Sequence, residues 1–147
     1  MNDSAGTGKW GSGEGASDAA SSGESAYGAG ATFEDFVKLD IRAACVLAAE
    51  PLAGARKPAL LLRLDCGPDL GERVSTAQLT ELYEPANLVG RLVLAVVNFP
   101  PRRVASVKSE CLTLGVYNSG GAGRSDGAVT LIVPDGAGNV QPGDRLG

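Results

Sequence analysis

Histidine is absent from this 147-residue chain, and its absence excludes several kinds of chemistry. Without an imidazole, no Ser-His-Asp or Cys-His nucleophile system can form, and neither can a His-ligated zinc or haem site. Aromatic residues make up only 5% of the chain, so few rings are present on which nucleic-acid bases could stack. We therefore expect no catalytic residues, no metal site and no cofactor.

Cysteine is scarce, and long apolar runs are missing. The chain has three cysteines, Cys45, Cys66 and Cys111, and no two of them form a C-x-x-C pair. An odd number with this spacing fits neither a zinc site nor a disulfide framework, so we expect reduced thiols. The longest mostly apolar stretch, residues 92–99, is far shorter than the ~20 residues of a membrane helix. The start of the chain has no basic segment followed by an apolar one. These features predict a soluble cytoplasmic protein with no membrane partner.

Small residues dominate the first part of the chain. Residues 1–31 contain 8 Gly, 7 Ala and 6 Ser, a composition that cannot bury enough apolar surface to offset the cost of ordering. We predict a disordered tail over residues 1–31 and one folded domain over residues 32–147. The predicted domain is nearly neutral, with 12 basic and 13 acidic residues, which excludes a broad basic field of the kind that wraps nucleic acid but allows a local basic groove.

Short apolar runs separated by Gly and Pro fill the predicted domain, and two brief helices interrupt them. Thr32 can cap a helical turn over residues 32–36, and the Pro near its start favours a second helix over residues 84–88. The expected strands cover residues 41–49, 59–65, 73–79, 91–99, 111–117 and 128–133. This pattern favours an all-β fold built as a small closed barrel, of which the OB-fold is one possibility.

Two polar clusters are candidates for binding. The first cluster, residues 75–78, can be interpreted either as an exposed strand face or as a binding surface. The second comprises residues 98–103 and 108–110, where an Asn, a Pro pair and three cations follow an apolar strand. Arg binds phosphate through two parallel hydrogen bonds, and Lys adds a point charge. The alternative is a charged hairpin that only keeps the protein soluble.

Five stretches of this sequence resemble the small CsaA proteins, which are stand-alone members of the tRNA-binding-domain family. They are FVKLDIR (36–42), ARKPA (55–59), STAQLT (75–80), VVNFPPRR (96–103) and KSECL (108–112). The resemblance implies a five-stranded OB-fold barrel, a homodimer, tRNA binding and a chaperone role toward unfolded or export-bound polypeptides. The RNA-binding residues that it implies, together with the adjacent cations, are Ser75, Thr76, Gln78, Asn98, Arg102, Arg103, Lys108, Ser109 and Glu110.

The sequence as a whole therefore predicts a non-enzymatic, cytoplasmic, homodimeric tRNA-binding protein. In this interpretation the cations hold phosphates, and the polar side chains on the barrel engage an exposed nucleotide. The alternative is a chaperone that binds an extended polypeptide, or a component of the export machinery, in the same groove.

Overall fold

Two units make up the chain, and they are described separately: residues up to Lys38 and residues from Leu39 onward. The structure, a computed structural model, describes residues 30–123 and 127–147, so most of the predicted tail lies outside the described residues. In the first unit, helix α2 (Phe33–Val37) starts with a capping box. The Asp35 N–H donates to Thr32 Oγ1 at 3.1 Å, and the Thr32 N–H donates to Asp35 Oδ2 at 2.9 Å. The helix predicted from Thr32 is therefore confirmed.

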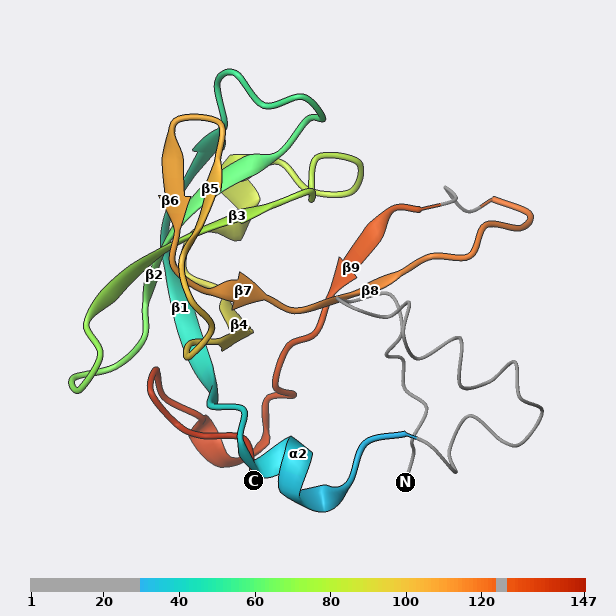
Figure 1. The fold of residues 1–147 in the computed structure, drawn as a ribbon. Helices are drawn as coiled ribbons and strands as arrows, with labels where there is room; N and C mark the ends of the chain where they lie inside the picture. The colour runs from blue at the N-terminus through green and yellow to red at the C-terminus, as the bar shows by residue number, and fades with distance from the viewer. Residues whose placement is uncertain (1–29, 124–126) are drawn as a thin grey trace. The chain divides into compact units, whose positions relative to one another are not determined.

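The second unit is built on a five-stranded antiparallel sheet (Figure 1). In spatial order its strands are β3 (Glu72–Ala77), β2 (Leu60–Asp65), β1 (Ile41–Pro51), β4 (Leu92–Val96) and β7 (Leu112–Thr113). β1 pairs with β4 through its first half and with β2 through its second half, and the register shifts between Val46 and Ala48. Such a shift bends a strand, as closure of a barrel requires. The prediction of an all-β, five-stranded OB-type barrel with short helices is confirmed.

Alternation of side chains along the strands builds the core. In β2, Leu60, Leu62 and Leu64 are all fully buried, while Arg63 between them is exposed. Leu88 of the short helix α3 (Pro85–Leu88) belongs to the same buried cluster. Each buried leucine stabilises the fold by roughly 1.5–3 kcal/mol relative to an exposed one. The barrel therefore has the apolar interior that the alternating leucines predict.

Two hairpins form separate two-stranded sheets. The first joins β5 (Arg102–Val104) to β6 (Val107–Ser109), and the second joins β8 (Gly115–Tyr117) to β9 (Val129–Leu131). Two predicted strands were therefore wrong in extent: the strand predicted over 91–99 ends at Val96, and the strand predicted over 111–117 is divided at Leu114. The cationic segment after residue 101 forms the β5–β6 hairpin, as in the hairpin alternative for that segment. The strand predicted over 111–117 divides because β7 pairs with β4 whereas β8 pairs with β9.

The C-terminal segment lies along the first half of β1, where the sequence predicted no element. After the 3-10 turn η1 (Ala137–Asn139), the Gly143 N–H donates to the Ala43 carbonyl at 2.8 Å, and the Leu146 N–H donates to the Ile41 carbonyl at 2.8 Å. A Cβ on Gly67 would lie 2.6 Å from the Gly143 Cα, so only glycine allows this close approach of two backbones. None of the helices in the described ranges has the length and hydropathy of a membrane span.

Candidate nucleic-acid interface

The β5–β6 hairpin carries three exposed cations. Arg102, Arg103 and Lys108 are all exposed, and the strand register places Arg103 directly opposite Lys108. Opposed residues in an antiparallel pair lie on the same face, and like charges at such positions repel each other. A polyanion bound to this face would relieve the repulsion.

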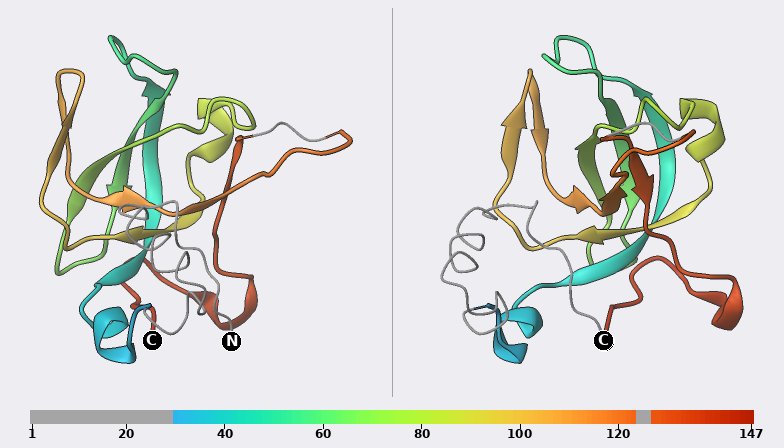
Figure 2. Two further views of the ribbon diagram at one scale, coloured as in Figure 1. Left: turned by 45° about the vertical axis from the view of Figure 1, so that its right-hand side comes forward. Right: turned by 90° about the vertical axis from the view of Figure 1, so that its right-hand side faces the viewer.

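A second cationic segment reaches the same end of the barrel. The loop between β1 and β2 contains Arg56 and Lys57, both exposed. A Cβ placed on Gly54 of this loop would lie 3.8 Å from the Cβ of Ala105 at the hairpin turn, so the loop and the hairpin touch. All views show the two segments side by side (Figure 1, Figure 2). We call this surface the basic end; its cations are Arg56, Lys57, Arg102, Arg103 and Lys108.

No carboxylate of the described residues forms an ion pair with any cation of the basic end. Other arginines of the second unit do have such partners. Arg63 is 2.7 Å from Glu72, and Arg42 and Arg145 both contact Asp40. The basic end is thus a local concentration of positive charge in a chain whose net charge is −4.

The polar cluster of residues 75–78 meets the cluster of residues 108–110 where the barrel closes. We call this junction, between β3 and residues 109–113, the seam. Ser75 is fully buried there, and its hydroxyl donates to the Cys111 carbonyl at 3.1 Å. Its oxygen also lies 2.8 Å from Thr113 Oγ1, so the two hydroxyl groups are hydrogen-bonded to each other. The reading of Ser75 as part of an exposed strand face was therefore wrong, because barrel closure buries it.

Side chains take the place of a strand ladder along the seam. The Val74 N–H donates to Glu110 Oε1 at 2.9 Å, and the Thr76 N–H donates to Ser109 Oγ at 3.2 Å. The Glu110 N–H donates to the Val74 carbonyl at 2.7 Å. Ser109 and Glu110 therefore satisfy the outward-facing edge of β3, which would otherwise be open for pairing.

The remaining predicted residues divide between the barrel and the surface. Asn98 follows β4, and its Oδ1 accepts a hydrogen bond from the Asp40 N–H at 2.9 Å. Gln78 is exposed directly after β3. The fold thus brings Ser75, Thr76, Ser109 and Glu110 together at the seam and Arg102, Arg103 and Lys108 together at the hairpin. Their role in binding RNA stays a prediction.

Sequence reasoning missed Thr113, the buried hydroxyl partner of Ser75. It stands in a mainly apolar run, and no spacing in the sequence connects it to Ser75, which lies 38 residues earlier. Only the pairing of β7 with β4 brings Thr113 to the seam. A polar residue in an otherwise mainly apolar predicted strand is the single signal that could have drawn attention to it.

Two of the three free cysteines lie against the seam. Cys66 and Cys111 are buried, and Cys111 Sγ lies 3.8 Å from the Val74 carbonyl, to which it donates. The interaction with the neighbouring Cys66 thiol and burial both raise the pKa of the Cys111 thiol, so this thiol stays protonated at neutral pH. The pair acts as small packing groups beneath the polar seam.

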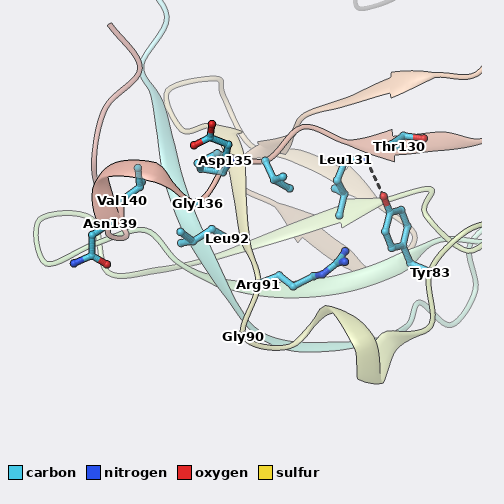
Figure 3. Close-up of a pocket in the computed structure, with 12 residues that line it drawn as sticks. Tyr83, Gly90, Arg91, Leu92, Thr130, Leu131, Asp135, Gly136, Asn139 and Val140 are labelled. Carbon is cyan, nitrogen blue, oxygen red and sulfur yellow. Dashed lines mark hydrogen bonds between the residues drawn. The ribbon is translucent and has the colours of Figure 1, made fainter.

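A pocket of ≈ 640 Å³ lies elsewhere, between the start of β4, the end of β9 and the η1 turn (Figure 3). The Arg91 guanidinium lies 5.6 Å from the centre of the Tyr83 ring, and the Tyr83 hydroxyl accepts the Leu131 N–H at 3.0 Å. Asp135 also lines the pocket. One cation and one carboxylate cancel in charge, so this pocket lacks the positive potential that the basic end offers to a polyanion.

The five-stranded barrel with its short helices defines a small OB-type domain, and comparison with known proteins identifies the family. A family model described as "Putative tRNA binding domain" matches residues 41–145, and the chain belongs to this family. The chain is similar in structure to the chaperone CsaA of Bacillus anthracis, with 43% identity, a TM-score of 0.69, and coverage of 81% of this chain and 100% of the other. For the CsaA chaperone of Picrophilus torridus, the identity is 35%, the TM-score 0.70, and the coverage 80% and 100%.

Curated relatives include much longer enzymes. The methionine–tRNA ligase of Porphyromonas gingivalis is 36% identical over 114 residues, which are 78% of this chain and 15% of the ligase. The corresponding ligase of Neisseria meningitidis is 37% identical over 119 residues, 80% of this chain and 16% of the ligase. The chain thus spans about a sixth of the length of these relatives. The resemblance to CsaA-like stand-alone tRNA-binding domains is confirmed.

Proposed function

We propose that this protein binds tRNA through its basic end, in the cytoplasm and without catalysing a reaction. The observation that carries the proposal is the meeting of two separate cationic segments, the β5–β6 hairpin and the β1–β2 loop. Because Arg103 and Lys108 are opposed on one face, phosphate binding relieves a repulsion that the free protein bears. The tRNA-binding-domain family to which the chain belongs supports tRNA as the polyanion.

Phosphate contacts supply affinity, and contacts to bases or to the tRNA shape supply selectivity. The guanidinium groups of Arg102 and Arg103 can each bind a phosphate through two hydrogen bonds. Among the polar candidates, Gln78 is exposed and near the seam, which suits it to contact an exposed nucleotide. The Asn98 side-chain oxygen already accepts a backbone N–H, which favours a structural role for that atom.

The test is a titration of tRNA at several salt concentrations with the wild type and with Arg102→Ala/Arg103→Ala. Each phosphate contact that is lost lowers the slope of log affinity against log salt by about 0.7–0.9. We expect a decrease in affinity on the order of 10- to 100-fold and a slope that is smaller by about 1.5. The thermal midpoint stays unchanged, because both side chains are exposed.

The matched control is Arg63→Ala/Arg145→Ala. It removes the same charge from two arginines that already pair with carboxylates, at 2.7 Å and 3.4 Å. The control is expected to change affinity and slope much less than the hairpin variant. Equal effects of the two variants would show that only net charge matters, and an unaffected hairpin variant would exclude the basic end as the RNA site.

A homodimer is the second part of the proposal, and the β8–β9 hairpin is the surface that supports it. Four large apolar side chains are exposed on or next to this hairpin: Val116, Tyr117, Ile132 and Val133. A two-stranded ribbon is marginally stable alone, and successive exposed apolar residues on one strand face both sides of it. A second copy of the chain would cover them and would offer two basic ends to one tRNA.

Binding of unfolded polypeptides is the alternative function, and the same exposed apolar residues favour it. Two structural relatives, from Bacillus anthracis and Picrophilus torridus, are CsaA chaperones. The seam is not a ready site for an added peptide strand, since Glu110 and Ser109 already occupy the Val74 and Thr76 amides. An aggregation-suppression assay distinguishes the functions: suppression that is insensitive to salt, with no binding of tRNA, would favour the chaperone.

A further inference from the structure

We infer that Glu110 is a positioning residue. It holds the β5–β6 hairpin, called the basic hairpin below, against β3 and does not itself contact RNA. The inference rests on the proposed function, because it concerns how the cations of the basic end are held in place. It changes the role that the resemblance implies for Glu110, from a binding residue to a support for the binding residues.

Glu110 forms two hydrogen bonds with a single residue of β3, and we call this pair of bonds the clamp. Its main-chain N–H donates to the Val74 carbonyl at 2.7 Å, and its side-chain Oε1 accepts the Val74 N–H at 2.9 Å. Glu110 therefore satisfies both backbone groups of Val74, as a neighbouring strand would. The bond to the carboxylate is charge-assisted, which makes it the stronger kind of hydrogen bond.

Ser109 extends the clamp to the base of the hairpin. It is the last residue of β6 and pairs in register with Arg102, and its hydroxyl accepts the Thr76 N–H at 3.2 Å. A two-stranded hairpin with three residues per strand is weak by itself. The bonds of Ser109 and Glu110 thus join this weak hairpin, at its base, to the edge of the five-stranded sheet.

Charge gives the second reason for a positioning role. A carboxylate two residues from Lys108 repels RNA phosphates, so its removal would by charge alone strengthen binding. Glu110 is half-buried, and Oε1 is engaged by the Val74 amide. The two roles therefore predict opposite signs: loss of the carboxylate weakens binding if it positions the cations, and strengthens binding if it acts only through its charge.

The experiment compares Glu110→Ala, Glu110→Gln and the control Glu81→Ala for tRNA affinity and for amide hydrogen exchange of the free protein. Gln keeps an oxygen that can accept the Val74 N–H, whereas Ala keeps none. We expect Glu110→Ala to weaken affinity on the order of tenfold and to speed exchange in β5 and β6. We expect Glu110→Gln to bind at least as tightly as the wild type, with unchanged exchange in the hairpin.

Glu81→Ala removes the same charge from an exposed residue of the β3–α3 loop, and it should bind with wild-type affinity or slightly tighter. The inference is wrong if Glu110→Ala binds as tightly as the wild type. It is also wrong if Glu110→Ala and Glu110→Gln weaken binding equally, or if affinity falls while hairpin exchange stays unchanged, which would indicate direct contact with RNA.

Two outcomes need a separate readout. If the wild type binds no tRNA, the proposed function fails, and hydrogen exchange in the hairpin alone then decides whether Glu110 is a clamp. If Glu110→Ala does not fold, Ser109→Ala replaces it, because that variant keeps Glu110 and loses only the two bonds of the Ser109 hydroxyl, to the Thr76 amide and to the Cys111 carbonyl. Faster exchange in the hairpin of Ser109→Ala supports the clamp, and unchanged exchange overturns it.

Discussion

The two hairpins outside the five-stranded sheet have strands of equal length but differ in their side chains and in the length of their connections. Each pairs two strands of three residues. The β5–β6 hairpin exposes cations and is joined to β3 by the side chains of Ser109 and Glu110. The β8–β9 hairpin exposes Val116 and Tyr117 and projects away from the barrel sheet (Figure 1, Figure 2). The same local structure therefore offers one surface for a polyanion and another for an apolar partner.

The attachments of the two hairpins differ as well. At the apolar hairpin, the Leu114 N–H donates to the Leu94 carbonyl at 2.9 Å, and the Tyr83 hydroxyl accepts the Leu131 N–H at 3.0 Å. The β8–β9 hairpin is thus held by the backbone of β4 and by the Tyr83 hydroxyl, whereas the β5–β6 hairpin is held by the Ser109 and Glu110 side chains and by the Glu110 main-chain N–H. Substitutions that change one hairpin at a time can separate their roles.

The largest expected effect is a loss of dimerisation when charges are placed on the β8–β9 hairpin, the apolar hairpin. Val116 and Val133 are 56% and 49% exposed, so Val116→Asp/Val133→Asp should fold normally and abolish dimerisation. Light scattering at micromolar concentration should give half the mass of the wild type. Affinity for tRNA should fall because one tRNA can no longer contact two basic ends, while the salt slope of each protomer stays the same.

Leu82→Asp is the matched control, because Leu82 is 45% exposed and lies outside both hairpins. Its mass should equal that of the wild type. A wild type that is already monomeric would refute the homodimer, and a Val116→Asp/Val133→Asp variant that keeps the dimer mass would place the interface on another surface.

The next largest effect concerns the attachment of the apolar hairpin. Tyr83→Phe removes the acceptor of the Leu131 N–H but keeps the ring on which Arg91 stacks. An amide left without a partner costs about 1–3 kcal/mol, so urea unfolding should show a decrease of that size. Amide exchange of β9 should become faster while exchange of β5 and β6 stays unchanged. Faster exchange in both hairpins would mean that they are not attached independently.

A smaller effect on the free energy of unfolding is expected from the ion pair of Arg42 with Asp40, which lies outside both hairpins. Arg42 contacts Asp40 at 2.6 Å, and this hydrogen bond, aided by the charges of Arg42 and Arg145, lowers the pKa of Asp40 despite its partial burial. Because the folded-state pKa lies below the ordinary value of 3.8, the stabilisation is complete above that value and is lost as the pH falls through the folded-state pKa.

Asp40→Asn should therefore lower the free energy of unfolding by about 1 kcal/mol at pH 7 and flatten its decrease in acid. Urea unfolding from pH 7 to pH 2.5 measures this. An Asp40→Asn variant whose stability falls in acid as steeply as that of the wild type would show that other carboxylates dominate. Since Asp40 lies outside the basic end, the tRNA salt slope at pH 7 should not change.

The smallest effect on stability is expected from a substitution at the turn of the basic hairpin. Ala105 has φ = +56°, a left-handed conformation that glycine adopts without steric cost. Ala105→Gly should stabilise the protein by about 0.5–1 kcal/mol, measured by urea unfolding, and slow the exchange of hairpin amides. A destabilised variant would show instead that the contact between Ala105 and the Gly54 loop outweighs the backbone strain.

Local patterns in the sequence were sufficient for much of the barrel. The alternation of Leu60, Leu62 and Leu64 predicts a half-buried strand, and Thr32 followed by acidic residues predicts the start of a helix. Both depend only on neighbours within a few positions, which is why they are readable without the fold. The exposure of Arg102 and Arg103 can likewise be predicted from local sequence, since two adjacent cations after a Pro pair cannot be buried without partners.

Tertiary structure alone decided what the polar residues do. Ser75 and Thr113 are 38 positions apart, and Glu110 lies 36 positions from the amide that it caps, so no local pattern connects them. Curvature of the sheet brings β3 to β7, and the buried Ser75 hydroxyl then needs hydrogen-bond partners, which are the Cys111 carbonyl and the Thr113 hydroxyl. The sequence by itself therefore determined which residues are apolar, charged or helix-capping, and closure of the barrel determined which polar residues form the seam and which remain at the surface.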